Sequence, residues 1–419
     1  MKGKKKVSSK KSVKQEKIRT WLGMELPVIH PSRRNLLLAT PVLTKIFVAI
    51  LTVVIFRSFI DMFDYGNYYL AVQNILAGLW PWAKGSTYYY PPLSLLPMSI
   101  AFLGSVLGGS MGFVVTMWIL MTVCDIVTVF CVYYVGLRIY QEQTAFIAAM
   151  LCATAISAAY YSLTKFDSFP VTIAAMAMLF TVYGEKTKGY LASIIGLFVK
   201  LWPIVLYPFL WIYNARESSV VAEGKARALP YLAGGGAVFG VMILLGYNKF
   251  LDYTNLVYSN TLLYLASRGL QVTGAAIPLD ALITVFRVLM VLVFLGAVYW
   301  MSRNPGSETR MMKMVLLSLV VLIFFIQYRS PQYTAWLVPF AALLVAGDVP
   351  GILSFYLVQV LGYIEFPLSF RAVWVNQEWK SGWAPVLFVA LFAAYGLLLW
   401  RAMKAPEAPA VPPGNKGAE

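Results

Sequence analysis

The sequence predicts an all-α polytopic membrane protein, and three observations support this fold class. First, 60% of the 419 residues are hydrophobic and only 12% are charged, which is about half the charged share of soluble domains. Second, apolar stretches approaching the length of a bilayer crossing recur along the whole chain. Third, lysine and arginine gather in alternate connecting segments, as they do in the cytoplasmic loops of multispan proteins.

The two ends of the chain differ in composition from the part between them. Residues 1–40 form a basic N-terminal segment that is dense in lysine up to Arg19, and we expect it on the cytoplasmic side beside membrane lipid rather than on nucleic acid. Residues 403–419 are rich in Pro and Ala and predict a disordered cytoplasmic tail. Residues 41–402 are the predicted transmembrane domain. The lysine block is too long for a secretory signal, and no cleavage site follows it.

Apolar length and the positive charges together predict roughly twelve transmembrane helices with both termini cytoplasmic. A further apolar segment, 91–108, begins with a Pro pair and is interpreted as a re-entrant or interfacial element, because counting it as a span would place Arg138 outside. The predicted spans are 41–60, 112–137, 145–162, 168–183, 189–201, 203–214, 230–246, 277–301, 314–328, 333–346, 351–367 and 383–400.

Several predicted spans are shorter than the roughly 20 residues that a full crossing needs. The pair 189–201 and 203–214 is the clearest case. Short helices end inside a protein-lined space, because irregular backbone in lipid leaves polar groups unsatisfied. We therefore expect short helices around an outward-facing cavity, covered by the first outer loop.

The predicted topology brings a mixed set of polar and charged residues to the outer side. Charges near membrane depth are costly and usually functional. With His30 as the only histidine, acid–base chemistry there must use carboxylates, Tyr or Lys. The three cysteines lie in apolar runs and predict neither a zinc site nor a disulfide framework. The outer set is Asp61, Asp64, Lys84, Lys165, Asp167, Lys200, Arg268, Arg329, Gln332, Arg371 and Glu378.

The first outer loop carries a pattern known from other membrane enzymes. DYGNYYLAVQNILAGLWPW (64–82) is followed by YYYPPL (88–93). This order of an Asp-Tyr pair, a helix ending in Gly78, an aromatic-Pro element and a Tyr-x-Pro-Leu element starting at Tyr90 resembles the GT-C superfamily of membrane glycosyltransferases. Within it, the sequence is most similar to the polyprenol-phosphate-mannose-dependent α-mannosyltransferases, which include the catalytic subunit of GPI mannosyltransferase I and prokaryotic relatives.

Four later stretches extend this resemblance over about residues 40–345. TKFDSF (164–169) matches the family's Gly-Gln/Asn-x-Asp turn at Asp167, whereas Lys165 departs from it. GLFVKLWPIVLYP (196–208) resembles the family's hairpin tip and matches it at Lys200. SRGLQVTG (267–274) matches an Arg-Gly-Leu-Gln element at Arg268. SPQYTAWLVP (330–339) resembles a late Ser-Gln-Tyr-x-x-Trp element.

The resemblance implies an inverting transfer of a sugar, with mannose as the expected one, from a polyprenyl- or dolichyl-phosphate donor to a lipid-linked or glycan acceptor. Asp64 is the candidate general base. Asp61 is the second candidate, although it could instead cap a helix or orient a lysine. Lys200 and Arg268 are candidates for the donor phosphate, because cations stabilise a departing phosphate. The substrate-binding candidates are Asp167, Lys165, Gln332, Tyr333 and Tyr90.

Other readings of the same residues remain open. Lys200 could form a structural pair with Asp167 or Asp61, and the i, i+3 spacing of Asp61 and Asp64 does not exclude hydrolysis. A secondary transporter or a lipid-linked-saccharide flippase also needs intramembrane charge, and a noncatalytic subunit of a glycosylation complex is a third reading. We expect no cofactor and no metal, and an accessory subunit is an open question. The membrane is expected to be the cell membrane, or that of the ER in a eukaryote.

Overall fold

The computed structural model describes residues 18–56, 61–82, 88–247, 261–274, 277–366, 368 and 384–407. A short hairpin of strands comes first: β1 (Ile18–Trp21) and β2 (Met24–Pro27). The helices of the first half are α1 (Pro31–Ile50), α2 (Phe63–Leu76), α3 (Leu95–Ile139), α4 (Glu142–Ala153), α5 (Ile156–Thr164), α6 (Ser168–Val182), α7 (Lys186–Val199) and α8 (Tyr207–Asn214). Those of the second half are α9 (Val220–Glu223), α10 (Leu229–Leu244), α11 (Leu262–Val272), α12 (Leu279–Arg303), α13 (Glu308–Phe325), α14 (Thr334–Val345), α15 (Val349–Glu365) and α17 (Ala384–Met403).

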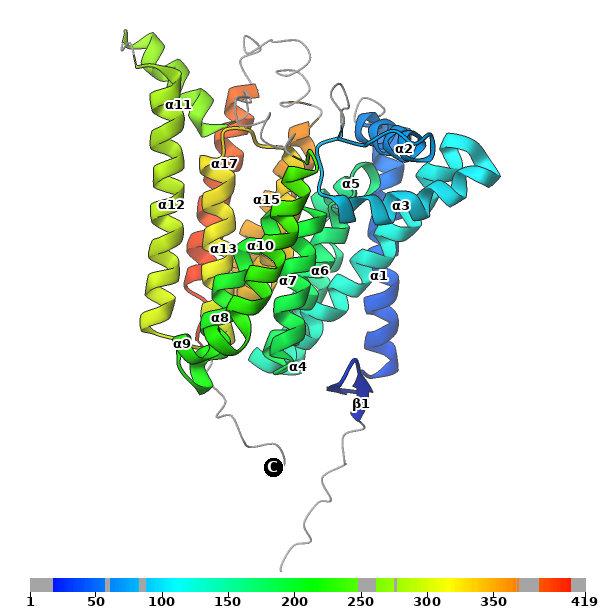
Figure 1. Ribbon diagram of the computed structural model, residues 1–419. Helices are drawn as coiled ribbons and strands as arrows, with labels where there is room; N and C mark the ends of the chain where they lie inside the picture. Colours follow the sequence, from blue (N-terminus) through cyan, green and yellow to red (C-terminus); the bar gives the residue numbers. More distant parts are fainter. Residues whose placement is uncertain are drawn as a thin grey trace, which may run out of the picture.

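These helices form one bundle, which confirms the predicted all-α polytopic membrane class. Most of the long helices run in a common direction, with α2 across one end of the bundle and the β1–β2 hairpin at the other (Figure 1). Every predicted span overlaps a helix of the described chain. By length and hydropathy alone, five helices could cross a membrane, or six if the bent pair α4–α5 is one span.

The first helix begins earlier than predicted. It starts at Pro31 rather than near residue 41, and a π-helical turn, Leu51–Ile55, continues it. Proline is favoured in the first turn of a helix because its missing N–H has no helical partner there. An apolar-length criterion misses this start, because the first turns contain Arg33 and Arg34, which are polar but helical. Helix α1 therefore crosses the predicted boundary at residue 40, and the division of the chain there stays a prediction.

Helix α3 folds back on itself in the middle. Gly108 and Gly109 leave the helical conformation, and the φ of Gly109 is +57°. The two arms pack so closely that a Cβ on Gly104 would lie 2.0 Å from the Thr116 hydroxyl. The break agrees with the prediction that 91–108 is a separate re-entrant or interfacial element. The second arm then runs to Ile139, beside α4 and α6.

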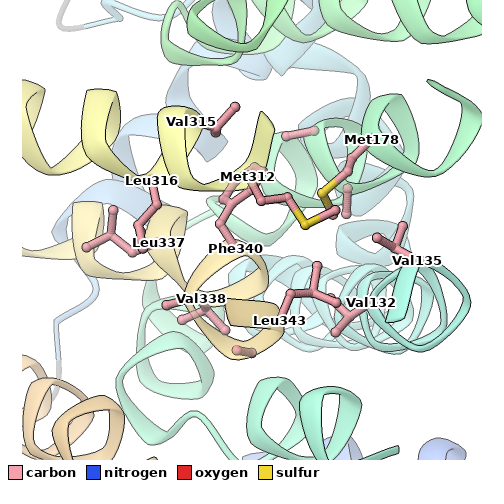
Figure 2. Close-up of a cluster of buried hydrophobic side chains, with 14 of the residues drawn as sticks. Val132, Val135, Met178, Met312, Val315, Leu316, Leu337, Val338, Phe340 and Leu343 are labelled. Carbon is pink, nitrogen blue, oxygen red and sulfur yellow. The ribbon is translucent and has the colours of Figure 1, made fainter. Parts of the chain in front are cut away.

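The interior of the bundle is apolar and closely packed. One large cluster joins α3, α6, α13 and α14, and Figure 2 shows Val132, Met178, Met312, Leu337 and Phe340 directed toward one another. Many large apolar side chains of α1, α10 and α12 are instead exposed. Outward apolar surface is expected of helices that face lipid. Buried polar side chains are therefore exceptions in a bundle that is apolar both inside and on its outward surface.

Polar contacts at the hairpin end tie several helix ends together. Lys186 Nζ donates to the carbonyl of Asn214, and Lys188 Nζ donates to that of Leu22 in the hairpin. Glu308 accepts from the Tyr213 hydroxyl, and Arg310 binds Glu407. The described segments nearest both chain ends therefore lie on one side of the bundle. This arrangement agrees with two termini on one side of the membrane, while the cytoplasmic side stays a prediction.

Candidate active site

Two carboxylates and one lysine meet at the α2 end of the bundle. Lys165 Nζ lies 2.5 Å from Asp61 Oδ2 and 2.8 Å from Asp64 Oδ2. Lys165 follows the last turn of α5 in an extended conformation, so the chain leaves the helix axis at this residue. The Asp64 side chain is 17% exposed, against 9% for that of Asp61. Asp64 is thus the carboxylate that a substrate can reach more easily.

The two aspartates have different second partners. Asp61 precedes α2 and accepts the backbone N–H of Phe63, the first helical residue, at 3.1 Å. Asp64 lies in the first turn of α2 and accepts the Tyr68 hydroxyl at 3.4 Å. Asp61 is therefore held by the backbone as well as by Lys165, whereas the other contact of Asp64 is a side-chain hydroxyl.

Lys165 keeps its positive charge in this setting. Burial lowers the pKa of its ammonium group, but the nearby carboxylates of Asp64 and Asp61 raise it more, so the pKa lies above its usual value of 10.5. Two carboxylates around one cation are tolerated because the ammonium group carries three donors. The three groups therefore connect the segment after α1 with the end of α5.

A second ion pair lies close by, at the break between α7 and α8. Lys200 Nζ lies 2.6 Å from Asp167 Oδ1, and the Trp336 indole N–H donates to the same oxygen at 2.7 Å. The other oxygen, Asp167 Oδ2, is buried and has no hydrogen-bond partner among the described residues. The break itself is tight, because a Cβ on Gly196 would meet the ring of Pro203 at 2.6 Å. Lys200 thus sits where the predicted short helices end, and it forms one of the two structural pairs that the sequence left open.

Aromatic rings surround the Lys200 ammonium group. Its nitrogen lies 5.2 Å from the ring centre of Phe166, 5.4 Å from that of Trp336, 5.5 Å from that of Tyr90 and 5.9 Å from that of Tyr333. Rings at this distance attract a cation by cation–π interaction. They also exclude water, which strengthens charge interactions inside the cluster. Aromatic faces suit the C–H surface of a sugar as well.

The structure brings most of the predicted site residues together, whereas Arg268 lies apart on α11. The joined set is Asp61, Asp64, Lys165, Asp167, Lys200, Tyr90 and Tyr333. Gln332 is buried beside this set and accepts the Ser330 hydroxyl. Arg268 lies on α11, where it binds the Tyr264 hydroxyl and Gln271. Its role toward phosphate stays a prediction.

Arg329, another charge of the predicted outer set, does not join the cluster. Arg329 is completely buried and forms a two-pronged ion pair with Glu365, including a bond of 2.8 Å from its second nitrogen. This guanidinium is enclosed by protein, so the pair links the segment before α14 to α15. Lys84, Arg371 and Glu378 lie outside the described residues.

Sequence reasoning did not select Trp336 or Phe166 as site residues. Trp336 stands in the quoted stretch 330–339, three residues after Tyr333, and this helical spacing could have pointed to it. Phe166 lies between Lys165 and Asp167, and only the direction of the turn shows that its ring faces Lys200. Among the described residues, no three His, Cys, Asp or Glu side chains gather in a way that could hold a metal ion.

Comparison with known proteins gives a distant structural likeness. No protein-family model and no curated protein sequence matches the chain. Among solved structures, the chain is similar to ArnT from Cupriavidus metallidurans bound to undecaprenyl phosphate, with a TM-score of 0.46 and 11% identity over 89% of this chain and 77% of that one. It is similar to the apo state of ArnT as well, with a TM-score of 0.45 and 14% identity over 88% and 78% of the two chains.

Proposed function

We propose that this chain is a membrane glycosyltransferase that moves a sugar from a polyprenyl- or dolichyl-phosphate donor to a hydroxyl of a lipid-linked or glycan acceptor. The observation that carries the proposal is a partly accessible carboxylate, Asp64, paired with the buried Lys165, beside a second buried lysine, Lys200, that aromatic rings surround at the same end of a membrane bundle. A base, cations and flat apolar walls are the groups that such a transfer needs.

The proposed reaction is a single displacement with inversion. The acceptor oxygen forms a bond to the anomeric carbon while the bond from that carbon to the phosphate oxygen breaks. Asp64 takes the hydroxyl proton, because it is the more exposed of the two aspartates. Asp61 keeps Lys165 in place through its backbone-anchored carboxylate. The bonding electrons leave with the phosphate, whose negative charge Lys200 stabilises.

The other predicted residues have roles that follow from where they lie. Tyr90 and Tyr333 form part of the wall around Lys200, and we propose that they border the sugar. Asp167 holds Lys200, and its unpartnered oxygen can accept a sugar hydroxyl. Gln332 lies one residue from Tyr333 and is proposed as a further substrate contact. Arg268 would add a cation from the α11 side.

The finer assignments rest on the sequence resemblance. It favours mannose as the sugar, a reaction without a metal or cofactor, and transfer on the outer or lumenal face of a cell or ER membrane.

One observation favours a second candidate, a secondary transporter or lipid-linked-saccharide flippase. The pair of Lys45 on α1 and Asp125 on α3 lies within helices that could cross the membrane. Charged pairs at such depth occur along substrate or proton pathways of transporters. The glycosyltransferase is preferred because the more exposed carboxylate, Asp64, belongs to the cluster of charged and aromatic residues at the α2 end of the bundle.

The test is single-turnover sugar transfer by the purified protein. It receives a panel of radiolabelled polyprenyl-phosphate sugars and a membrane-lipid extract as acceptor. Asp64→Asn should abolish transfer while leaving donor binding nearly intact. Asp280→Asn is the matched control, because it makes the same change at an exposed acid in the first turn of α12. Full activity in Asp64→Asn would refute the base assignment, and movement of labelled lipid across liposomes without transfer would favour the flippase.

A further inference from the structure

A second buried ion pair lies deeper in the bundle, and the proposed reaction does not use it. Lys45 Nζ on α1 lies 2.7 Å from Asp125 Oδ2 on α3, and the Lys45 side chain is only 6% exposed. Taking two charges out of water costs free energy that their attraction does not always return. Ionisable groups within membrane helices are therefore rare and usually serve function. The question is what this pair holds in place.

Asp125 connects the pair to the last turn of α5. The Ser162 hydroxyl donates to Asp125 Oδ2 at 3.0 Å, the same oxygen that faces Lys45. One residue later, the carbonyl of Leu163 accepts the indole N–H of Trp118 on α3 at 2.7 Å. Helix α3 thus forms two hydrogen bonds with α5, directly before the backbone turns at Lys165.

A small cavity reaches the other end of the same turn. It measures about 30 Å³, and its polar lining includes Asp125, Thr128 and Ser168. A water molecule needs roughly 10–15 Å³ of such space and two or more polar partners. Ser168 is the first residue of α6, just beyond Asp167. A water here would join Asp125 to the start of α6, as Ser162 joins it to the end of α5.

We propose that Lys45 and Asp125 are positioning residues for the turn Lys165–Asp167. This turn carries two of the charged side chains of the candidate site, Lys165 and Asp167. The Lys45–Asp125 pair holds the turn directly at Ser162 and, in this proposal, through a water at Ser168. Lys45 adds the third connection, because α1 runs on toward Asp61 and Asp64. The Lys45–Asp125 pair therefore connects the chain segment that supplies Asp61 and Asp64 with the segment that supplies Lys165.

The inference rests on the proposed function for its kinetic consequence only. Under that function, a loosened turn moves Lys165 relative to Asp64 and Asp167 relative to Lys200, and therefore lowers kcat/KM for the donor. A pair that served folding alone would behave differently. Its replacement by apolar side chains of similar size is often neutral or stabilising, and it would leave both the turn and kcat/KM unchanged.

The test combines hydrogen–deuterium exchange with kinetics on the full chain in lipid nanodiscs. The double variant Lys45→Met/Asp125→Leu removes both charges without leaving either one unpaired. We expect at least a tenfold faster exchange of the amides in peptides covering 160–170, and at least a tenfold lower kcat/KM for the donor. Asp348→Asn, which breaks the Arg401 pair at the far end of the bundle, should change neither.

Ser162→Ala, with Ser162→Thr as its rescue, keeps the pair and removes only its hydrogen bond to α5. It should raise exchange in the same peptides by a smaller factor, and this arm decides the question if the double variant does not fold. Unchanged exchange in these variants would overturn the inference. Faster exchange in a protein whose wild type transfers no sugar would support the positioning role while rejecting the proposed function.

Discussion

The pair of Lys200 and Asp167 allows a prediction whose size follows from burial. Asp167 is 1% exposed, and Lys200 with Trp336 supplies its hydrogen bonds. Replacing Lys200 by Met leaves a buried carboxylate with one indole N–H, and breaking a buried pair in this way costs about 3–5 kcal/mol. Asp167→Leu leaves Lys200 among four rings, each worth about 0.5–1 kcal/mol to a cation. The loss there should be about 2 kcal/mol smaller.

The double variant Lys200→Met/Asp167→Leu has no orphaned charge, so its stability should approach that of wild type. We therefore expect a coupling free energy of about 4–8 kcal/mol between the two changes, close to the sum of the two single losses. Thermal unfolding in one detergent, followed by tryptophan fluorescence and by loss of monodisperse protein, measures the three variants against wild type. Additive losses would refute the argument, because they would show that Lys200 and Asp167 do not depend on each other in the folded protein.

Three further predictions concern the remaining charges. Asp64→Asn should lower kcat by about 10²–10⁴-fold, the usual contribution of a general base, whereas Asp61→Asn should lower it less but reduce the melting temperature more, because Asp61 is the more buried carboxylate of the two that hold Lys165; the reverse order would exchange their roles. The melting-temperature difference between wild type and Lys165→Met should stay constant from about pH 6 to 9, since a raised pKa keeps its stabilisation complete below about pH 10.4 and loses it only above the folded pKa; a difference that shrinks within this range would contradict the raised pKa. Arg268→Ala should weaken donor binding about tenfold if Arg268 contacts the phosphate, with the donor Kd as the measurement and an unchanged Kd as the contrary result.

The sequence predicted most of the fold because the membrane imposes a length and a charge rule on each helix. The separate segment 91–108 was visible from the Pro pair at its start, and the short helices on either side of Lys200 from the length of their apolar runs. The start of α1 was not, since arginines in a first turn lower hydropathy without ending a helix. Hydropathy indicates which part of a helix lies in lipid, and a helix can extend beyond that part.

The site was predictable in its members but not in its pairings. The outer placement of Lys165, Lys200 and the aspartates follows from topology alone. Which aspartate each lysine meets depends on the rotation of α5 and α7 and on the direction of the turn at Phe166. The sequence left Asp167 and Asp61 open as partners of Lys200. Lys200 meets Asp167, whereas Lys165 meets Asp61 before α2 and Asp64 in its first turn. The direction of a side chain at a helix end is set by how the helices pack against one another in the tertiary structure.

The charge balance of the cluster has a consequence for turnover. Three carboxylates face two ammonium groups, so one negative charge is in excess. Under the proposed reaction, the donor brings a phosphodiester with a single charge, and the spent carrier leaves as a phosphomonoester that holds more than one at neutral pH. A pocket already rich in carboxylate repels the second form more strongly than the first. Product escape would then be driven by the same aspartates that hold the lysines, and the spent lipid phosphate would be a poor inhibitor.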